Sequence, residues 1–313
     1  MNLKSVRAAA CLLLSVSLLA LSAPARAQTS IDADRGPRYY VGHSLVSAAL
    51  LGGYLAFARA PFLRKGKRWS AFGRFDSSVE MYFNDGAARL SDTLVVSTAF
   101  VMPAAVHWGH GVDTALGNTA IVYTEALAAN LALNGIVKYA VGRPRPYLAR
   151  MIQTDPHAKE LEAADPNDAY LSFYSGHSST AFAGAAASSI LFSLRSDNSL
   201  QTHFVWGAEF LAAGATASLR VSAGRHHRSD VIVGTLIGTA LGYGFPAAHR
   251  LDLSQVKATE MGVGTATAIL GFGLVELLRP PNSVTIEVPL ETSWTLLPGQ
   301  VGGAPGMLAV GAF

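Results

Sequence analysis

Cysteine and charge are both scarce in this sequence. Cys11 is the only cysteine among the 313 residues, and it lies within residues 1–27, which have the features of a cleaved leader. The rest of the chain therefore forms no disulfide and uses no thiol chemistry. Charged residues make up 14% of the chain, where about a quarter is usual, and 50% of the residues are hydrophobic. We expect apolar packing to hold the fold together.

The leader has the three parts of an export signal. Lys4 and Arg7 precede an apolar run over residues 10–21, and the small-x-small triplet at 25–27 is typical of a cleavage site. Cys11 comes before most of the apolar run rather than after it, so we do not expect it to be lipidated. Residues 1–27 are therefore predicted to be a signal peptide, and the protein is expected to be exported to a bacterial-type periplasm.

The net charge gives no support for a nucleic-acid partner. The formal charge of +3 belongs to the leader, because Lys4, Arg7 and Arg26 are there and no acidic residue is. The chain after the leader is neutral, so its pI carries no information about polyanions. The sequence also has no dinucleotide-binding fingerprint, P-loop or nucleophile elbow.

Apolar segments of helical length dominate the rest of the chain, and none of them alternates with a period of two. We therefore predict helices over residues 39–58, 93–108, 117–140, 178–195, 204–219, 231–248 and 258–278. Residues 28–38 are polar and expected to be irregular, and Phe75–Asp85 is expected to form an amphipathic helix. Residues 281–313 contain an alternating stretch and a Gly- and Pro-rich turn, which predicts a short β-hairpin-like tail.

Polar residues inside two of these segments bear on membrane insertion. Glu125, Asn130 and Asn134 interrupt the third segment and Glu209 the fifth, and such groups are costly when they face lipid. A cleaved leader also leaves the start of the chain outside, so three crossings would place residues 138–146 in the cytoplasm. We favour helices that pack together in the periplasm. Membrane-associated and multi-pass arrangements stay open.

Three polar clusters each adjoin an apolar segment: residues 138–147, 172–180 and 220–230. In the second cluster, Ser175 and Gly176 lie at a predicted helix start, where free backbone N–H groups bind anions. His177 would project from the first turn of that helix. An N-cap role alone also explains Ser175.

The other two clusters supply cations and an imidazole. Lys138 and Arg145 lie on a stretch that prolines stiffen, which suits a multi-oxygen anion, although positive charge at a helix C-terminus is favourable in itself. Arg220 begins the third cluster, in which His226 precedes Asp230 by four residues. A carboxylate bonded to one ring nitrogen would leave the other as nucleophile or base. A helix cap with a solvated loop is the alternative, but the three clusters together favour one anion site.

No metal site is predicted. His107 and His110 have i, i+3 spacing, but no carboxylate or third histidine lies near them in the sequence. We interpret this pair as structural or interfacial, and His227 as a neighbour of His226.

The three clusters resemble the motifs of the type 2 phosphatidic acid phosphatase (PAP2) superfamily, which includes class A acid phosphatases and vanadium haloperoxidases. The first motif, K-x6-R-P, is Lys138 to Pro146; the second, P-S-G-H, is residues 174–177; the third, S-R-x5-H-x3-D, is residues 219–230. Tyr174 and Leu219 depart from the family pattern, where proline and serine stand. The resemblance covers about residues 40–250.

The resemblance implies an all-α, PAP2-type bundle of about six core helices over residues 39–280, followed by the β-hairpin-like appendage. It implies that His226 attacks phosphorus to form a phosphohistidine, that Asp230 orients His226, and that His177 protonates the leaving group. The implied phosphate-binding residues are Lys138, Arg145, Ser175, Gly176 and Arg220.

The expected activity is metal-independent hydrolysis of a phosphomonoester or pyrophosphate, whether a lipid phosphate such as phosphatidic acid, an isoprenyl pyrophosphate or a small soluble molecule. No cofactor is expected, and vanadate should inhibit. A vanadium-dependent haloperoxidase and a non-catalytic lipid- or anion-binding protein are the alternatives.

Overall fold

The computed structural model describes residues 30–58, 76, 84–109, 111–146, 168–278, 294–301 and 304–311. The predicted signal peptide, His110 and nearly all of the predicted Phe75–Asp85 helix lie outside these residues. The chain divides into two compact units, Met1–Arg279 and Pro280–Phe313.

The first unit is built from helices, as predicted. Their bounds are α2 (Gly36–Ala58), α4 (Asp85–Val96), the π-helical η2 (Ser97–Val101), α5 (Met102–Trp108), α6 (Thr114–Val141), the 3-10 turn η3 (Asp168–Tyr170), α9 (Gly176–Ser193), α10 (Ser199–Ser222), α11 (Arg228–Ala248), the 3-10 turn η4 (Leu253–Gln255) and α12 (Ala258–Leu277). The all-α prediction is therefore confirmed.

Several of these helices begin earlier than predicted, because their first turns are polar and capped. The clearest case is α4, whose N-cap Asn84 accepts a hydrogen bond from the backbone N–H of Ala87. The predicted helix began only at residue 93, where the apolar run starts. The extra turns matter because they carry Ser91 and Asp92 to the candidate site.

The second unit contains a two-stranded antiparallel hairpin. Strand β1 (Trp294–Val301) pairs with β2 (Ala304–Gly311), with Trp294 opposite Gly311 and Val301 opposite Ala304. This is the hairpin expected in the tail, although the alternating stretch that suggested it, residues 284–288, lies outside the described residues.

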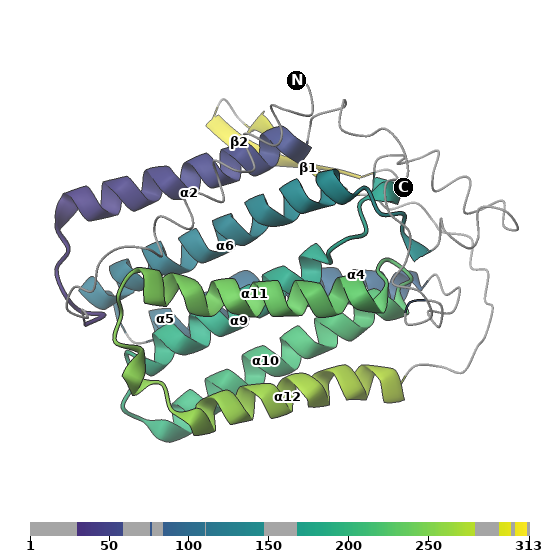
Figure 1. The fold of residues 1–313 in the computed structure, drawn as a ribbon. Helices are drawn as coiled ribbons and strands as arrows, with labels where there is room; N and C mark the ends of the chain where they lie inside the picture. Colours follow the sequence, from purple (N-terminus) through teal and green to yellow (C-terminus); the bar gives the residue numbers. More distant parts are fainter. Residues whose placement is uncertain are drawn as a thin grey trace, which may run out of the picture. The chain divides into compact units, whose positions relative to one another are not determined.

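Helix α9 is the central element of the first unit. It contacts α4, α6, α10 and α11, and nearly all of its side chains from Ser178 to Ser193 are buried. Figure 1 shows the long helices side by side with their axes running in roughly the same direction. In the core, Trp206 and Phe210 stack with their ring centroids 5.4 Å apart and pack with residues of α9. The ends of these helices therefore gather at the two ends of the bundle.

A row of glycines brings α11 unusually close to α9. Gly234, Gly238 and Gly242 recur every fourth residue, so they share one face of α11. A Cβ atom added at Gly238 would lie 2.1 Å from the backbone oxygen of Ser179, far inside van der Waals contact. Only hydrogen fits there. This contact fixes the start of α11 against the start of α9.

The substitution Gly238→Ala should therefore destabilise the protein by roughly 1–3 kcal/mol, because the two helices have to separate. Thermal unfolding of the purified protein measures the effect. Gly244→Ala is the matched control: it lies on the same helix, and an added Cβ there meets nothing within 4 Å. Because alanine favours helix over glycine, Gly244→Ala should unfold at the same or a higher temperature. Equal losses in both variants would contradict the close-packing explanation.

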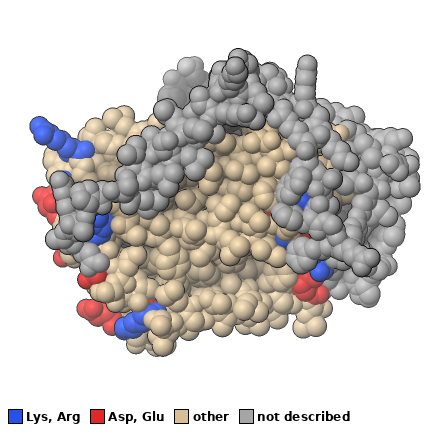
Figure 2. Space-filling view, viewed as in Figure 1, with Lys and Arg blue, Asp and Glu red and all other residues tan. Residues whose placement is uncertain are grey.

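Among the residues that the structure describes, four helical stretches are long and apolar enough to cross a membrane: Gly86–Trp108, Thr114–Val141, Arg228–Ala248 and Ala258–Leu277. Figure 2 shows a wide band of uncharged residues across the visible face, with Lys, Arg, Asp and Glu gathered towards its two ends. The exposed side chains of α12 include Ile269, Leu270 and Leu277. These features fit membrane association.

The polar residues that interrupt two of the predicted apolar segments lie inside the bundle. Glu125, Asn130, Asn134 and Glu209 are all buried. Asn130 donates to the hydroxyl of Thr180, and Glu209 accepts hydrogen bonds from two serines of α9. Because they face other helices rather than the outer surface, their polarity does not oppose crossing. The periplasmic arrangement, which also depended on the number of crossings after a cleaved leader, stays a prediction.

Candidate functional site

The predicted site residues lie at the ends of four helices. Lys138 is in the last turn of α6, and Arg145 follows that helix. Ser175 is the N-cap of α9, and Gly176 and His177 are its first residues. Arg220 is in the last turn of α10. His226 precedes α11, and Asp230 is in the first turn of α11. Residues from three distant parts of the sequence are thus brought to one end of the bundle.

His226 is buried, and its hydrogen bonds select one tautomer. Its Nδ1 lies 2.8 Å from the backbone oxygen of Ser172, and a carbonyl can only accept, so Nδ1 carries the proton. The lone pair is then on Nε2, which lies 3.3 Å from a guanidinium nitrogen of Arg145. The ring therefore presents a nucleophilic nitrogen to a cation that could hold an anion beside it.

Asp230 does not bond directly to His226, contrary to the expected pairing. The nearest carboxylate oxygen is 3.8 Å from His226 Nδ1. That oxygen, Oδ2, accepts hydrogen bonds from the hydroxyl of Ser172, at 2.5 Å, and from the backbone N–H of His227, at 2.9 Å. Asp230 therefore acts on His226 through Ser172, which binds the carboxylate with its side chain and the imidazole with its backbone.

Arg143 ties this arrangement to a distant aspartate. Its guanidinium donates to Asp230 Oδ1 at 2.5 Å, to Asp76 Oδ2 at 2.6 Å and to the Ser229 hydroxyl at 2.7 Å. Asp76 also accepts from the backbone N–H and the hydroxyl of Ser229. All four residues are buried. Arg143 is thus paired with two carboxylates at once.

Arg145 is anchored by groups that the sequence analysis did not identify. Its guanidinium donates to the side chain of Asp168 at 2.5 Å and to the backbone oxygens of Asp168 and Arg225. Burial alone would raise the pKa of Asp168, but Arg145 and Lys138 outweigh it and lower that pKa to about 2. Asp168 is therefore ionised at any ordinary pH and holds Arg145 beside His226.

Asp92 connects the other histidine to the third cation. His177 Nε2 lies 2.7 Å from Asp92 Oδ1, and Arg220 donates to the same oxygen at 3.1 Å and to the hydroxyl of Ser91 at 2.9 Å. One carboxylate oxygen is thus shared by two of the predicted site residues.

Ser175 and Gly176 have local roles that their position at a helix start explains. The Ser175 hydroxyl accepts from the backbone N–H of Ser178 and caps α9, and its own N–H donates to the backbone oxygen of Asp230. A Cβ at Gly176 would lie 2.8 Å from a side-chain oxygen of Asn134. The N-cap interpretation of Ser175 therefore holds. The hydrogen bond to Asp230 also joins the second cluster to the third.

The environment of both site histidines lowers their pKa and so disfavours the charged form of each ring. Burial, with Arg220 and Lys138 acting in the same direction and Asp92 opposing, lowers the pKa of His177 to about 4. Burial, followed by the charges of Arg145, Arg220 and Lys138, holds the pKa of His226 well below its usual range. A phosphate dianion among these cations would offset their charge and favour protonation of an adjacent imidazole. Anion binding would thus raise the pKa of an imidazole that lies beside the anion.

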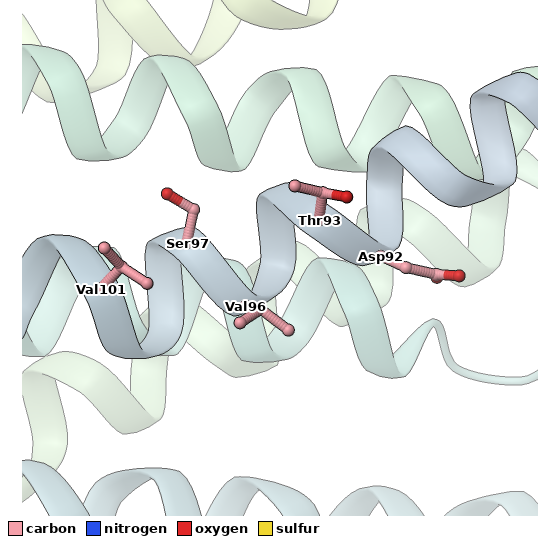
Figure 3. Close-up of a pocket in the computed structure, with 5 residues that line it drawn as sticks. All are labelled: Asp92, Thr93, Val96, Ser97 and Val101. Carbon is pink, nitrogen blue, oxygen red and sulfur yellow. The ribbon is translucent and has the colours of Figure 1, made fainter. Parts of the chain in front are cut away.

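A shallow, largely apolar pocket lies beside Asp92. It is lined by Asp92, Thr93, Val96, Ser97 and Val101. Figure 3 shows these side chains along α4 and η2, with Asp92 at one end of the row and Val101 at the other. The pocket therefore extends along α4 and η2 from Asp92, which also contacts His177.

The remaining predicted histidines lie in structural positions. His107 is buried, and its Nε2 lies 3.3 Å from the hydroxyl of Ser188. His227 is the N-cap residue of α11 and has its Nε2 3.2 Å from the backbone oxygen of Pro144. His227 is therefore a neighbour of His226 in the sequence, with separate hydrogen bonds.

Comparison with known families agrees with this geometry. The family model described as the PAP2 superfamily matches residues 119–252. This range holds every residue predicted for the site from Lys138 to Asp230, but neither Asp76 nor Asp92. No solved structure matches the chain.

Proposed function

We propose that this protein is a phosphatase that transfers a phosphoryl group to His226 and then to water, and the match of the PAP2 superfamily model to residues 119–252 supports this. The observation that carries the proposal is the environment of His226: a buried, neutral ring with Nδ1 protonated and Nε2 beside Arg145. The family match supports a phosphoric ester hydrolase in general.

In the first step, the lone pair of His226 Nε2 attacks phosphorus. A P–N bond forms, the bond from phosphorus to the leaving oxygen breaks, and His177 gives that oxygen a proton. In the second step, His177 takes a proton from water, and the resulting oxygen replaces His226 on phosphorus. Lys138, Arg145 and Arg220 would hold the phosphoryl oxygens, as such transfer depends on positioning and charge stabilisation. These side chains would supply the positive charge that metal ions supply in other phosphatases.

We further propose that the substrate is a lipid phosphate or pyrophosphate and that the protein is exported and acts at a membrane. The apolar pocket beside Asp92 supports a substrate with a hydrocarbon chain next to its phosphate. The helices apolar enough to cross a bilayer support a membrane location. Export rests on the leader features of residues 1–27.

A substrate panel tests the function. The purified full-length protein would be given lipid phosphates, isoprenyl pyrophosphates and soluble phosphomonoesters, with and without vanadate, beside a bromide-oxidation assay with peroxide. We expect vanadate-sensitive phosphate release, fastest with lipid substrates, and no bromide oxidation. Bromide oxidation that depends on vanadate would favour the haloperoxidase alternative. Anion binding without turnover of any substrate would favour the non-catalytic one.

The substitution Asp92→Asn should strengthen the binding of phosphate. The Asp92 carboxylate engages both His177 and Arg220, so it competes with a phosphate oxygen for these groups and repels the dianion. Removing its charge should lower the inhibition constant of inorganic phosphate by about tenfold, equivalent to about 1.4 kcal/mol.

Asp197→Asn is the control for that measurement, because Asp197 is an exposed aspartate on the loop between α9 and α10. It should leave the inhibition constant unchanged. A higher constant for Asp92→Asn than for the unmodified protein would show that Asp92 assists anion binding instead of competing with it.

A further inference from the structure

Three potential metal-ligating side chains meet in the first unit, away from the candidate phosphatase site. They come from three segments that are far apart in the sequence: His43 of α2, Glu125 of α6 and His249, which follows α11. One oxygen of Glu125, Oε2, lies 2.8 Å from His43 Nδ1 and 2.9 Å from His249 Nε2. The three atoms all lie within 4.8 Å of one another. At 1.5 Å per residue, Lys138 is about 20 Å further along α6, so this cluster is separate from the phosphate-binding residues.

A second layer of contacts holds His249 in place. The hydroxyl of Tyr39 lies 2.6 Å from His249 Nδ1, and Arg35 donates to the backbone oxygen of His249 at 3.1 Å. Histidines that bind metals are usually oriented through the ring nitrogen that does not touch the metal. With a metal on Nε2, His249 Nδ1 would carry the proton and donate it to the Tyr39 oxygen. The existing contact therefore suits a metal-bound ring.

We propose that His43 Nδ1, Glu125 Oε2 and His249 Nε2 form a binding site for a divalent transition metal of the zinc type. Two imidazoles and one carboxylate are a recognised zinc ligand set, and they leave a fourth position for water or another ligand. Metal–ligand bonds of about 2.1 Å in tetrahedral geometry separate the ligand atoms by about 3.4 Å. The two hydrogen-bonded pairs would therefore widen by roughly half an ångström as the ion enters.

The three side chains of the proposed site differ in burial in a way that suits metal binding. Glu125 and His249 are buried, so their polar atoms are withdrawn from water, while the side chain of His43 is 35% exposed and leaves one side open for entry. The main alternative is a cluster without metal, in which the Glu125 carboxylate accepts one N–H hydrogen bond from each imidazole ring. Both arrangements explain the short distances, but only the metal site would retain a metal ion.

Metal analysis of the purified full-length protein tests the proposal. The protein would be stripped with a chelator, loaded with Zn²⁺, freed of excess metal and analysed for zinc, and a second sample would be loaded with Co²⁺ for visible spectroscopy. We expect about one zinc per chain, and Co²⁺ absorption bands typical of four- or five-coordinate sites with nitrogen and oxygen ligands. His43→Ala should weaken zinc binding at least tenfold, measured against a competing chelator.

His203→Ala is the matched control, because His203 is a partly exposed histidine of α10 outside the proposed ligand set, and it should bind zinc as the unmodified protein does. Glu125→Gln and His249→Ala alter buried groups and would be interpreted only where thermal unfolding shows a folded protein. His43→Ala is the deciding variant because its side chain is partly exposed. The proposal is overturned if the unmodified protein retains no zinc after loading, or if His43→Ala binds zinc as tightly as His203→Ala does.

Discussion

Replacing His226 by alanine should lower kcat by at least about a thousandfold, because the proposed mechanism forms its bond to phosphorus through this ring. The ring is buried beside Arg145 and has its proton fixed on Nδ1, so it cannot easily be replaced by a neighbouring side chain. The measurement is phosphate release from the best substrate of the panel, at saturating concentration.

Two further measurements make that result specific. His203→Ala should keep normal kcat, because His203 is partly exposed and lies at the opposite end of α10 from Arg220. Rapid acid-free quenching with labelled substrate should trap phosphate on the unmodified protein and none on His226→Ala. Phosphate release that survives in His226→Ala at more than a few per cent of normal would mean that another residue is the nucleophile.

Arg143→Met should destabilise the fold by about 3–5 kcal/mol, the usual cost of removing one partner from a buried ion pair. Methionine preserves much of the apolar stem but leaves Asp76 and Asp230 without the cation that both of them contact at 2.5–2.6 Å. For a domain of this size, the loss corresponds to a fall in the unfolding temperature of roughly 6–20 °C. Thermal unfolding followed by circular dichroism would measure it.

Arg89→Met is the matched control for Arg143→Met, because Arg89 is an exposed arginine of α4. It should unfold within a degree or two of the unmodified protein. The pair Asp76→Asn and Arg143→Met should also be less than additive, because each variant removes the same interaction. Additive losses would show that Asp76 and Arg143 stabilise the protein independently.

The helices could be predicted from the sequence because their apolar runs are long and continuous. The segment that became α11 was predicted over 231–248 and spans Arg228–Ala248. The missing residues are first turns, where capping groups such as Asn84 are polar and the apolar pattern has not yet begun. The polar residues of α6 could also be identified in the sequence. Whether their side chains face other helices or the outer surface could not be predicted, because this depends on which helices pack beside α6.

The residues of the candidate site could be predicted from the sequence, but the hydrogen-bond partners of these residues could not. The spacing of Lys138, His177 and His226 relative to their neighbours is local and can be read along the chain. The partners of these groups are distant: Asp92 is 85 residues from His177, and Ser172 is 54 residues from His226. Isolated aspartates and serines carry no signal of such contacts. The cluster of His43, Glu125 and His249 was missed for the same reason, since its members are 82 and 124 residues apart.

The main-chain acceptor of His226 has a consequence for variation at position 172. The backbone oxygen of residue 172 keeps the proton of His226 on Nδ1. Any amino acid that preserves the backbone conformation at 172 would therefore also keep the lone pair on Nε2. The serine hydroxyl is needed only to satisfy Asp230. Exchanges such as Ser172→Ala or Ser172→Thr should therefore alter how firmly the neighbouring carboxylate is anchored without switching the protonation pattern of the imidazole. The backbone at residue 172, and not its side chain, thus orients the His226 ring.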